Sequence, residues 1–205
     1  MKRVHMIPLF LAALLLLTAC GRRAPKGAAV EPGDDAVEPF TQVRHAEITI
    51  RDYGTIKVEL DEGTAPITVA NFIKLAQSGF YDGLTFHRII DGFMIQGGDP
   101  LGTGYGGSEE TIKGEFSKNG VYNPISHTEG IISMARGDEP DSGSSQFFIT
   151  VADDTFLDGS YAAFGRVTEG LEIAKQIAKD AKPYDDNGSI YPDAQPVIES
   201  IVIID

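Results

Sequence analysis

The sequence predicts a mainly β protein, built as an antiparallel barrel or sandwich with two helices. Its 205 residues include 23 Gly and 11 Pro but no Trp, a composition typical of folds with many tight turns. Short strand-like segments recur along the chain, punctuated by Gly, Asp and Asn. Only two segments have the pattern of a helix. These patterns do not separate a closed barrel from a sandwich.

The strand-like segments begin with a predicted β-hairpin. Residues 46–50 and 56–60 alternate apolar and polar side chains on either side of Asp52-Tyr53-Gly54, which suits a turn. Further along the chain, the predicted strands are residues 84–90, 93–96, 131–135, 146–151, 162–167 and 197–204. Strands this short and numerous favour an antiparallel sheet that closes or packs on itself.

Two helices are predicted to cover this sheet. The first can be capped by Thr64, can hold Pro66 in its first turn, and can end at Gly79. Its apolar side chains share one face, so we expect that face to pack on the sheet. The second helix is predicted over residues 169–179.

Residues 1–19 have the pattern of a secretory signal peptide. Lys2 and Arg3 precede an apolar run that is too short for a comfortable membrane-spanning helix. The run ends in Leu17-Thr18-Ala19-Cys20, which resembles the bacterial lipobox. We therefore expect cleavage before Cys20 and lipidation of that residue, with an ordinary signal peptide as the alternative. Cys20 is the only cysteine, which excludes an internal disulfide.

Residues 20–44 are predicted to be the lipidated cysteine and a flexible tether, because they are rich in Pro, Gly, Ala and acidic residues. The folded domain is expected over residues 45–205. A coil of the tether's length spans on the order of 25–30 Å. The predicted location is outside the cytoplasm, on a bacterial membrane.

The mature chain is expected to be strongly acidic. Removing residues 1–19 takes away Lys2 and Arg3 and no acidic residue, so the formal charge changes from −13 to −15. Such a surface disfavours nucleic acid and anionic lipid headgroups as partners. Membrane attachment should therefore come from the acyl chains on Cys20.

The segment from Phe86 to Asp99 carries an arginine in an unexpected setting. In regular strand geometry Leu84, Phe86 and Arg88 point to one face, so the guanidinium stands among apolar neighbours and needs a partner. The segment alone leaves two interpretations open: a structural ion pair or a functional group.

This segment closely resembles the signature of the cyclophilins, a family of peptidyl-prolyl cis/trans isomerases. Residues 86–99 read Phe-His-Arg-Ile-Ile-Asp-Gly-Phe-Met-Ile-Gln-Gly-Gly-Asp. Residues 130–135 with 144–150, and then residues 156–165, resemble the second and third family blocks in the family's order. The resemblance covers nearly all of the chain after about residue 46. It implies a closed eight-stranded antiparallel β-barrel capped by two α-helices.

The resemblance also implies an active site for X–Pro bonds in exported or surface proteins. Arg88 would be the catalytic arginine, and Gln96 and Gln146 would orient Arg88 or the substrate carbonyl. The residues expected to bind the peptide are Phe86, Phe93, Met94, Ala135, Arg136, Phe148, Phe156, Leu157 and Tyr161. No cofactor is needed for this reaction, and the chain is expected to act as a monomer.

Three positions depart from the familiar pattern of the family. Phe156 stands where many eukaryotic members have Trp, Tyr161 where they have His, and Arg136 where Asn is common. The aromatic wall is kept but its polar edge changes. We expect weak cyclosporin binding, as the resemblance to bacterial members implies.

Other motifs predict neither a nucleotide nor a metal. Gly102-x-Gly104-x-x-Gly107 matches a dinucleotide pattern, but no clear strand leads directly into it and no amphipathic helix follows. The histidines of the mature chain have no metal-ligand spacing, and His87 is expected to face away from Arg88. Two competing functions stay open: a non-catalytic chaperone module that binds proline-containing peptides, and a solute-binding lipoprotein.

Overall fold

The computed structural model describes residues 42–205. The predictions for the signal peptide, for Cys20 and for most of the tether lie outside these residues. The first strand begins at Val43, so the last two residues of the predicted tether, Val43 and Arg44, belong to the sheet. Within residues 42–205, no helix has both the length and the apolar character that crossing a bilayer requires.

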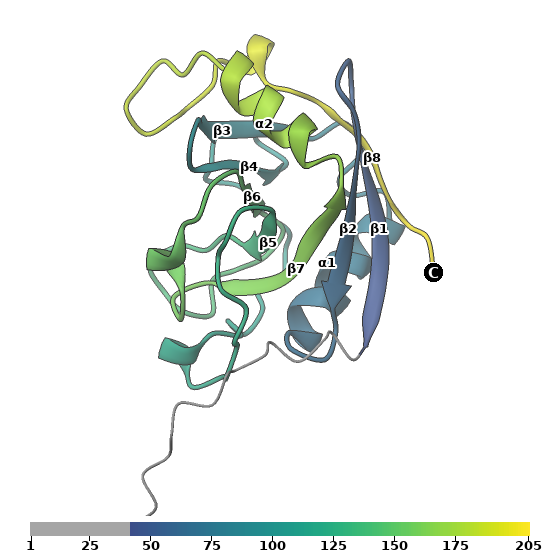
Figure 1. Ribbon diagram of the computed structural model, residues 1–205, viewed down its shortest axis with the longest axis vertical. Helices are drawn as coiled ribbons and strands as arrows, with labels where there is room; N and C mark the ends of the chain where they lie inside the picture. Colours follow the sequence, from purple (N-terminus) through teal and green to yellow (C-terminus); the bar gives the residue numbers. More distant parts are fainter. Residues whose placement is uncertain (1–41) are drawn as a thin grey trace, which may run out of the picture. The chain divides into compact units, whose positions relative to one another are not determined.

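Eight antiparallel strands form a single curled sheet (Figure 1). They are β1 (Val43–Ile50), β2 (Gly54–Asp61), β3 (Thr85–Ile90), β4 (Met94–Asp99), β5 (Ile131–Met134), β6 (Phe147–Thr150), β7 (Ala162–Glu169) and β8 (Ile198–Ile203). Their order is β3-β4-β6-β5-β7-β2-β1-β8. Each predicted strand falls on one of these elements, with boundaries that differ by a few residues.

The two ends of this order, β3 and β8, are not joined by a ladder, so the described residues form an open, curled sheet. The closed barrel expected from the family is not confirmed. An isolated bridge links Thr85 to Val197. Further along β3, the backbone N–H of Ile89 donates to the carbonyl of Gly188 at 2.8 Å. The outer edge of β3 is thus covered by the chain that leads into β8.

Two helices pack against the sheet, as expected. Helix α1 (Pro66–Gln77) contacts β2, β7 and β8, and α2 (Leu171–Asp180) contacts β2 and β4. Gly79 follows α1 with φ +71°, a left-handed conformation that suits glycine after a helix end. Three short 3₁₀ turns were not predicted: η1 (Ser117–Asn119), η2 (Thr155–Leu157) and η3 (Pro192–Ala194).

The start of α1 is capped by a distant carboxylate and not by Thr64. The N-cap residue is Ala65, which has no side chain to do this work. The buried carboxylate of Glu115 accepts from the backbone N–H of Ile67 at 3.1 Å and of Thr68 at 2.8 Å, and from the Thr68 hydroxyl at 2.7 Å. This contact ties α1 to the loop that precedes η1.

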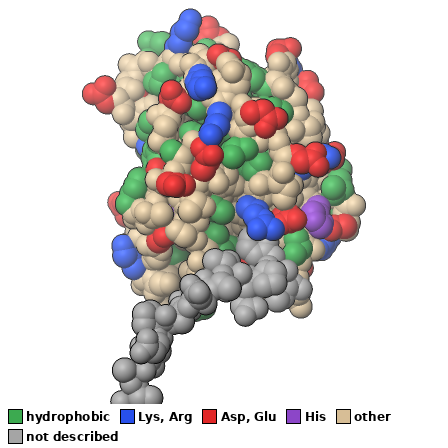
Figure 2. Space-filling view, in the orientation of Figure 1, with side chains coloured by type: hydrophobic (Ala, Val, Ile, Leu, Met, Phe, Trp, Pro, Cys, Tyr) green, Lys and Arg blue, Asp and Glu red, His purple; other side chains and the backbone are tan. Residues whose placement is uncertain are grey.

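Two apolar clusters lie on opposite faces of the central strands. The larger one fills the inside of the curl, where Phe72 contacts Tyr81, Phe147 and Phe164 with ring centroids 5.3–5.4 Å apart. The smaller one is built on Met94, Ala135, Phe148 and Leu157. Because side chains alternate along a strand, β6 gives Phe147 to the first cluster and Phe148 to the second. Acidic and basic side chains are spread over the face shown in Figure 2.

Candidate functional site

A β-bulge in β3 decides where Arg88 points. Phe86 pairs with Gly97 and Arg88 pairs with the adjacent Gln96, so His87 is an extra residue in the strand. Phe86 therefore faces the inner core, where it is fully buried, while Arg88 faces the smaller cluster on the other side. The prediction that these two side chains share a face was wrong because it assumed regular alternation.

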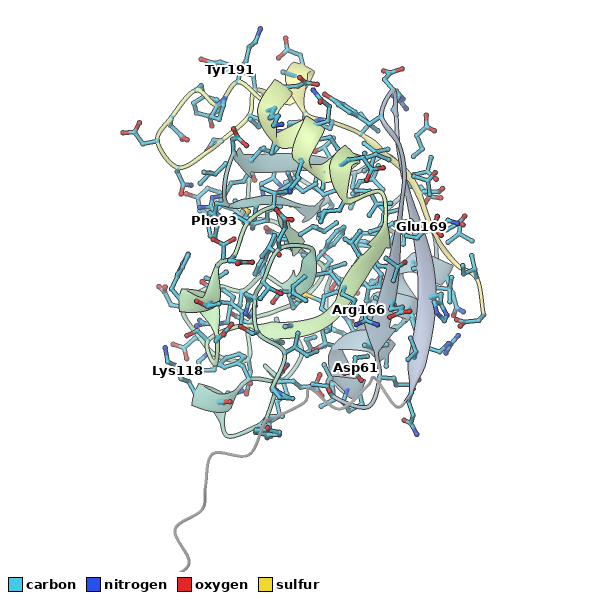
Figure 3. The ribbon with its side chains drawn as sticks, in the orientation of Figure 1. Asp61, Phe93, Lys118, Arg166, Glu169 and Tyr191 are labelled. Carbon is cyan, nitrogen blue, oxygen red and sulfur yellow. The ribbon has the colours of Figure 1, made fainter. Side chains whose placement is uncertain are left out.

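An open cavity of about 450 Å³ lies over the smaller cluster. Nine of the predicted site residues line it: Arg88, Phe93, Met94, Gln96, Ala135, Arg136, Phe148, Leu157 and Tyr161. Phe86, Gln146 and Phe156 do not. Gln146 lines a neighbouring hollow of about 320 Å³. Phe156 is 71% exposed and packs its ring 5.6 Å from that of Phe93, which lies in the turn between β3 and β4 (Figure 3).

Several lining residues were not predicted. His87 is 4% exposed and lines the cavity beside Arg88, although it was expected to face away. The bulge accounts for this position. The other additions come from the loop after β4 and from the loop that follows α2: Gly102, Thr103, Gly104, Tyr105, Tyr184, Asp185, Asn187, Ser189 and Ile190.

Arg88 is held by neutral groups. Its Nε donates to the backbone carbonyl of Asn187 at 2.7 Å, and its Nη1 donates to Oε1 of Gln96 at 3.2 Å. Its Cζ lies 5.8 Å from the ring centroid of Phe93. Within residues 42–205 no carboxylate lies at ion-pair distance from Arg88, and its Nη2 has no hydrogen-bond partner there. The structural ion pair considered above is therefore absent from this part of the chain.

The charge of Arg88 is partly desolvated. Burial lowers the pKa of its guanidinium, and Tyr161 and Asp185 oppose that change. A guanidinium keeps its proton at any physiological pH even so. The result is a permanent cation with an unsatisfied N–H group at the edge of an apolar cavity.

Two glutamine side chains set the orientation of this arginine. Nε2 of Gln146 donates to the carbonyls of Gly104 at 3.0 Å and Gly106 at 2.7 Å. Its Oε1 therefore accepts from Nε2 of Gln96, at 2.9 Å, and this leaves Oε1 of Gln96 facing Arg88. Gln146 thus acts through Gln96, although it lies outside the cavity itself.

The apolar floor of the cavity is packed from behind. Met94, Phe148 and Leu157 are each less than a tenth exposed. Behind Phe148, the His127 ring stacks at 6.0 Å and 17° and is held through Nδ1 by Asp158 at 2.8 Å. Burial is the main cause that lowers the pKa of His127, so the ring is neutral at pH 7. The floor is an apolar surface that is packed against the ring of His127.

Arg136 forms part of the opposite wall through its contacts with aromatic rings. Its Cζ lies 4.9 Å from the centroid of Tyr161 and 5.1 Å from that of Phe116. Its Nε donates to the carbonyl of Ser160 at 2.9 Å. The guanidinium is therefore occupied within the protein and holds Tyr161 in place.

The turn that carries Leu157 contains a carboxyl group with an altered pKa. Asp154 is 4% exposed, and its Oδ2 has no hydrogen-bond partner among the described residues. Burial, and then the charge of Asp153, raise the pKa of Asp154 to about 6. The backbone carbonyl of Asp154 accepts from the N–H of Leu157 at 2.9 Å, so Asp154 lies at the start of η2.

We expect the stability of the protein to fall as the pH rises from about 4 to about 6 because of Asp154. In that window the folded state binds the proton and the unfolded state has released it, so deprotonation costs up to about 3 kcal/mol of unfolding free energy. Urea unfolding of wild type and Asp154→Asn at about pH 4.5 and about pH 7.5 measures this. Asp91→Asn, at an exposed turn, is the control. An equal change with pH in wild type and Asp154→Asn would contradict the assignment.

The fold and the cavity together define an enzyme of the prolyl isomerase type. Comparison with known proteins agrees. The family model for the cyclophilin type peptidyl-prolyl cis-trans isomerases matches residues 45–203. Peptidyl-prolyl cis-trans isomerase B of Bacillus subtilis is 50% identical over 129 residues, 63% of this chain and 87% of that protein. Peptidyl-prolyl cis-trans isomerase A of Dickeya dadantii is 40% identical over 164 residues, 74% of this chain and 80% of that protein.

A solved structure gives the same result. The crystal structure of a cyclophilin type peptidyl-prolyl cis-trans isomerase from Cryptosporidium parvum aligns with a TM-score of 0.70 at 32% identity, and covers 80% of this chain and 99% of that one. The chain belongs to the cyclophilin-type peptidyl-prolyl cis-trans isomerases.

Proposed function

We propose that this isomerase acts on X–Pro bonds of exported or surface proteins, with Arg88 as the catalytic group. One observation carries the assignment of the site. Arg88 is a partly desolvated cation held by Asn187 and Gln96, with no carboxylate at ion-pair distance in the described chain and with Nη2 left for a substrate oxygen. An arginine that served a structural ion pair would have an acid partner.

The reaction breaks no covalent bond, so it needs no nucleophile. It needs a site that stabilises the twisted amide. Conjugation gives the amide bond double-bond character, and this sets a rotational barrier of roughly 18–20 kcal/mol. An acceleration of ~10⁵ requires the barrier to fall by roughly 7 kcal/mol. One charged hydrogen bond contributes about 1.5–3 kcal/mol, which is too little by itself. Several groups must therefore favour the twisted amide together.

The floor and the edge of the cavity both contribute to lowering the barrier. Met94, Phe148 and Leu157 remove water from the prolyl ring. Arg88 donates to the proline carbonyl and to the nitrogen lone pair that twisting sets free. Because a bound prolyl ring displaces water from the cavity, the donated hydrogen bond is stronger than it would be in solution.

A solved relative supports a proline-containing peptide as the ligand. A second structure of the Cryptosporidium parvum isomerase was determined in the presence of the dipeptide Ala-Pro, and it aligns with this chain at a TM-score of 0.69 and 33% identity. We infer that an X–Pro segment enters the cavity above Met94 and Phe148 here.

The test is an isomerisation assay on a proline tetrapeptide with the purified chain. We expect faster exchange between the cis and trans forms in NMR exchange spectroscopy, without a coupled protease. The competing function, a non-catalytic chaperone module for proline-containing peptides, predicts binding with no faster exchange. Binding alone would therefore overturn the proposed enzyme activity.

We propose further that acyl chains on Cys20 attach the protein to a bacterial membrane on its extracytoplasmic side. The lipobox-like sequence Leu17–Cys20 and the polar stretch after it support this. Cys20→Ala should move the protein from the membrane fraction to the soluble fraction and abolish incorporation of labelled fatty acid. Unchanged membrane association of this variant would rule out the anchor.

We also propose that cyclosporin binds weakly and that the monomer is the active form. Phe156 has no side-chain N–H to offer a ligand and packs on Phe93, which supports weak binding of cyclosporin. Inhibition at nanomolar cyclosporin would contradict the first statement. Activity per chain that rises with protein concentration would contradict the second.

A further inference from the structure

We propose that residues 184–189, called here the 184–189 segment, form a subsite for the side chain that follows the proline, and that Asp185 makes this subsite favour lysine or arginine. The inference rests on the proposed function of the cavity. The segment lies in the loop between α2 and η3, which runs beside β3 in Figure 1. Tyr184, Asp185, Asn187 and Ser189 line the cavity together with Arg88.

The 184–189 segment is fixed to β3 by its backbone. Ser189 forms an isolated bridge with Arg88, and Gly188 accepts from Ile89 N–H at 2.8 Å. Gly188 has φ +85°, and a Cβ at this position would lie 2.5 Å from Cγ1 of Ile90. Only glycine allows so close an approach. The segment is therefore a built wall of the cavity.

The contact with Arg88 places this wall relative to the substrate. Asn187 accepts from Nε of Arg88, on one side of the guanidinium, while Gln96 accepts from Nη1. If the guanidinium binds the carbonyl of the proline, the next residue is attached directly to that bound carbonyl group. Its side chain then lies beside Arg88, within reach of the segment that contacts Arg88.

The charges at this wall favour a cation. Asp185 is the only carboxylate among the residues that line the cavity in the described chain, and Asp186 adds a second charge next to it. Backbone hydrogen bonds, chiefly from Ser189, lower the pKa of Asp185, so it is ionised at neutral pH. Arg136 is turned to Tyr161 and Phe116, and Arg88 is held by Asn187 and Gln96. A lysine side chain is long enough to extend past Arg88 to these acids.

The experiment compares three peptides of the form Ala-Ala-Pro-Xaa with Lys, Gln or Glu at Xaa. Catalysed exchange is followed by NMR with the full-length chain, so no protease selects among the peptides. We expect kcat/KM to be about two- to fivefold higher for the Lys peptide than for the Glu peptide. The ratio should fall towards one in about 0.5 M salt, because the charges are exposed.

The variant Asp185→Asn should bring the Lys-to-Glu ratio close to one. In the wild type, Oδ1 of Asp185 accepts from the N–H of Ser189 at 2.9 Å. Asparagine keeps an oxygen that can accept this hydrogen bond, so the loop should keep its shape. Asp193→Asn, which removes an exposed charge in η3 outside the cavity, is the matched control and should keep the wild-type ratio.

The outcomes separate the two proposals. Catalysis of all three peptides at equal rates, or a Lys-to-Glu ratio that survives Asp185→Asn, would refute the subsite and leave the isomerase intact. A preference for the Glu peptide would show that Arg88 and Arg136 dominate, and would also refute it. Failure to catalyse any of the peptides would refute the proposed function itself.

Discussion

Replacing Arg88 by alanine should lower kcat/KM for a proline tetrapeptide by about 10²- to 10³-fold, the loss typical of removing one preorganised donor at a charge-stabilising site. The variant keeps the apolar floor but loses the donor that Gln96 and Asn187 hold in place. Since Arg88 contributes no ion pair within residues 42–205, the midpoint of urea unfolding should stay close to that of the wild type. The rate is measured by NMR exchange, and the fold by circular dichroism.

Arg88→Lys is the matched variant for this prediction. An ammonium group carries the same charge but cannot donate to Asn187, to Gln96 and to a substrate in one plane, so it should recover little of the lost rate. Recovery to within about threefold of wild type by lysine would show that charge alone suffices. Wild-type activity in Arg88→Ala would mean that the catalytic group has been misassigned.

Replacing Glu115 by alanine should lower the unfolding free energy by about 3 kcal/mol, because hydrogen bonds to a charged group are each worth roughly 1.5–3 kcal/mol and α1 loses its cap. The Glu115 carboxylate is 2% exposed and accepts from two backbone N–H groups and one hydroxyl at the start of α1. Urea unfolding at neutral pH measures the loss.

Two controls make this prediction specific. Glu115→Gln keeps the shape and one acceptor oxygen, so its loss should be intermediate. Glu110→Ala removes an exposed carboxylate that pairs with Lys74 of α1. This change should shift the midpoint of urea unfolding far less. If Glu110→Ala destabilises the protein as much as Glu115→Ala, the cap does not explain the effect.

The strands and the helices could be predicted from the sequence because they depend on local patterns. Alternation marks β1 and β2, and Pro66 and Gly79 bound α1. The cap of α1 could not be predicted, since Glu115 is 47 residues away from Thr68 along the chain. Threonine is a favoured N-cap residue, but the N-cap position falls on Ala65, one residue after Thr64. The side chain of Glu115 caps α1 in place of the expected Thr64.

The site was predicted through the family resemblance. The errors in that prediction come from two features of the chain. The bulge at His87 reverses the alternation in β3, which moves Phe86 into the core and brings His87 to the cavity. Nothing in regular strand periodicity signals this. The 184–189 segment was missed because its motif, Asn187-Gly188-Ser189, suggests only a turn. The approach of that turn to β3 is long-range and depends on the closeness that Gly188 allows.

The backbone that lies along the outer edge of β3 has a consequence for an enzyme whose substrates are peptides. A bare strand edge has unpaired amide and carbonyl groups. An extended polypeptide could pair with these groups and add to the sheet as a further strand. Here the N–H of Ile190 donates to the carbonyl of His87, and the N–H of Phe86 donates to the carbonyl of Pro196. These hydrogen bonds occupy backbone groups of β3 that a peptide would otherwise use to pair with this edge. This edge of β3 is therefore closed to strand addition.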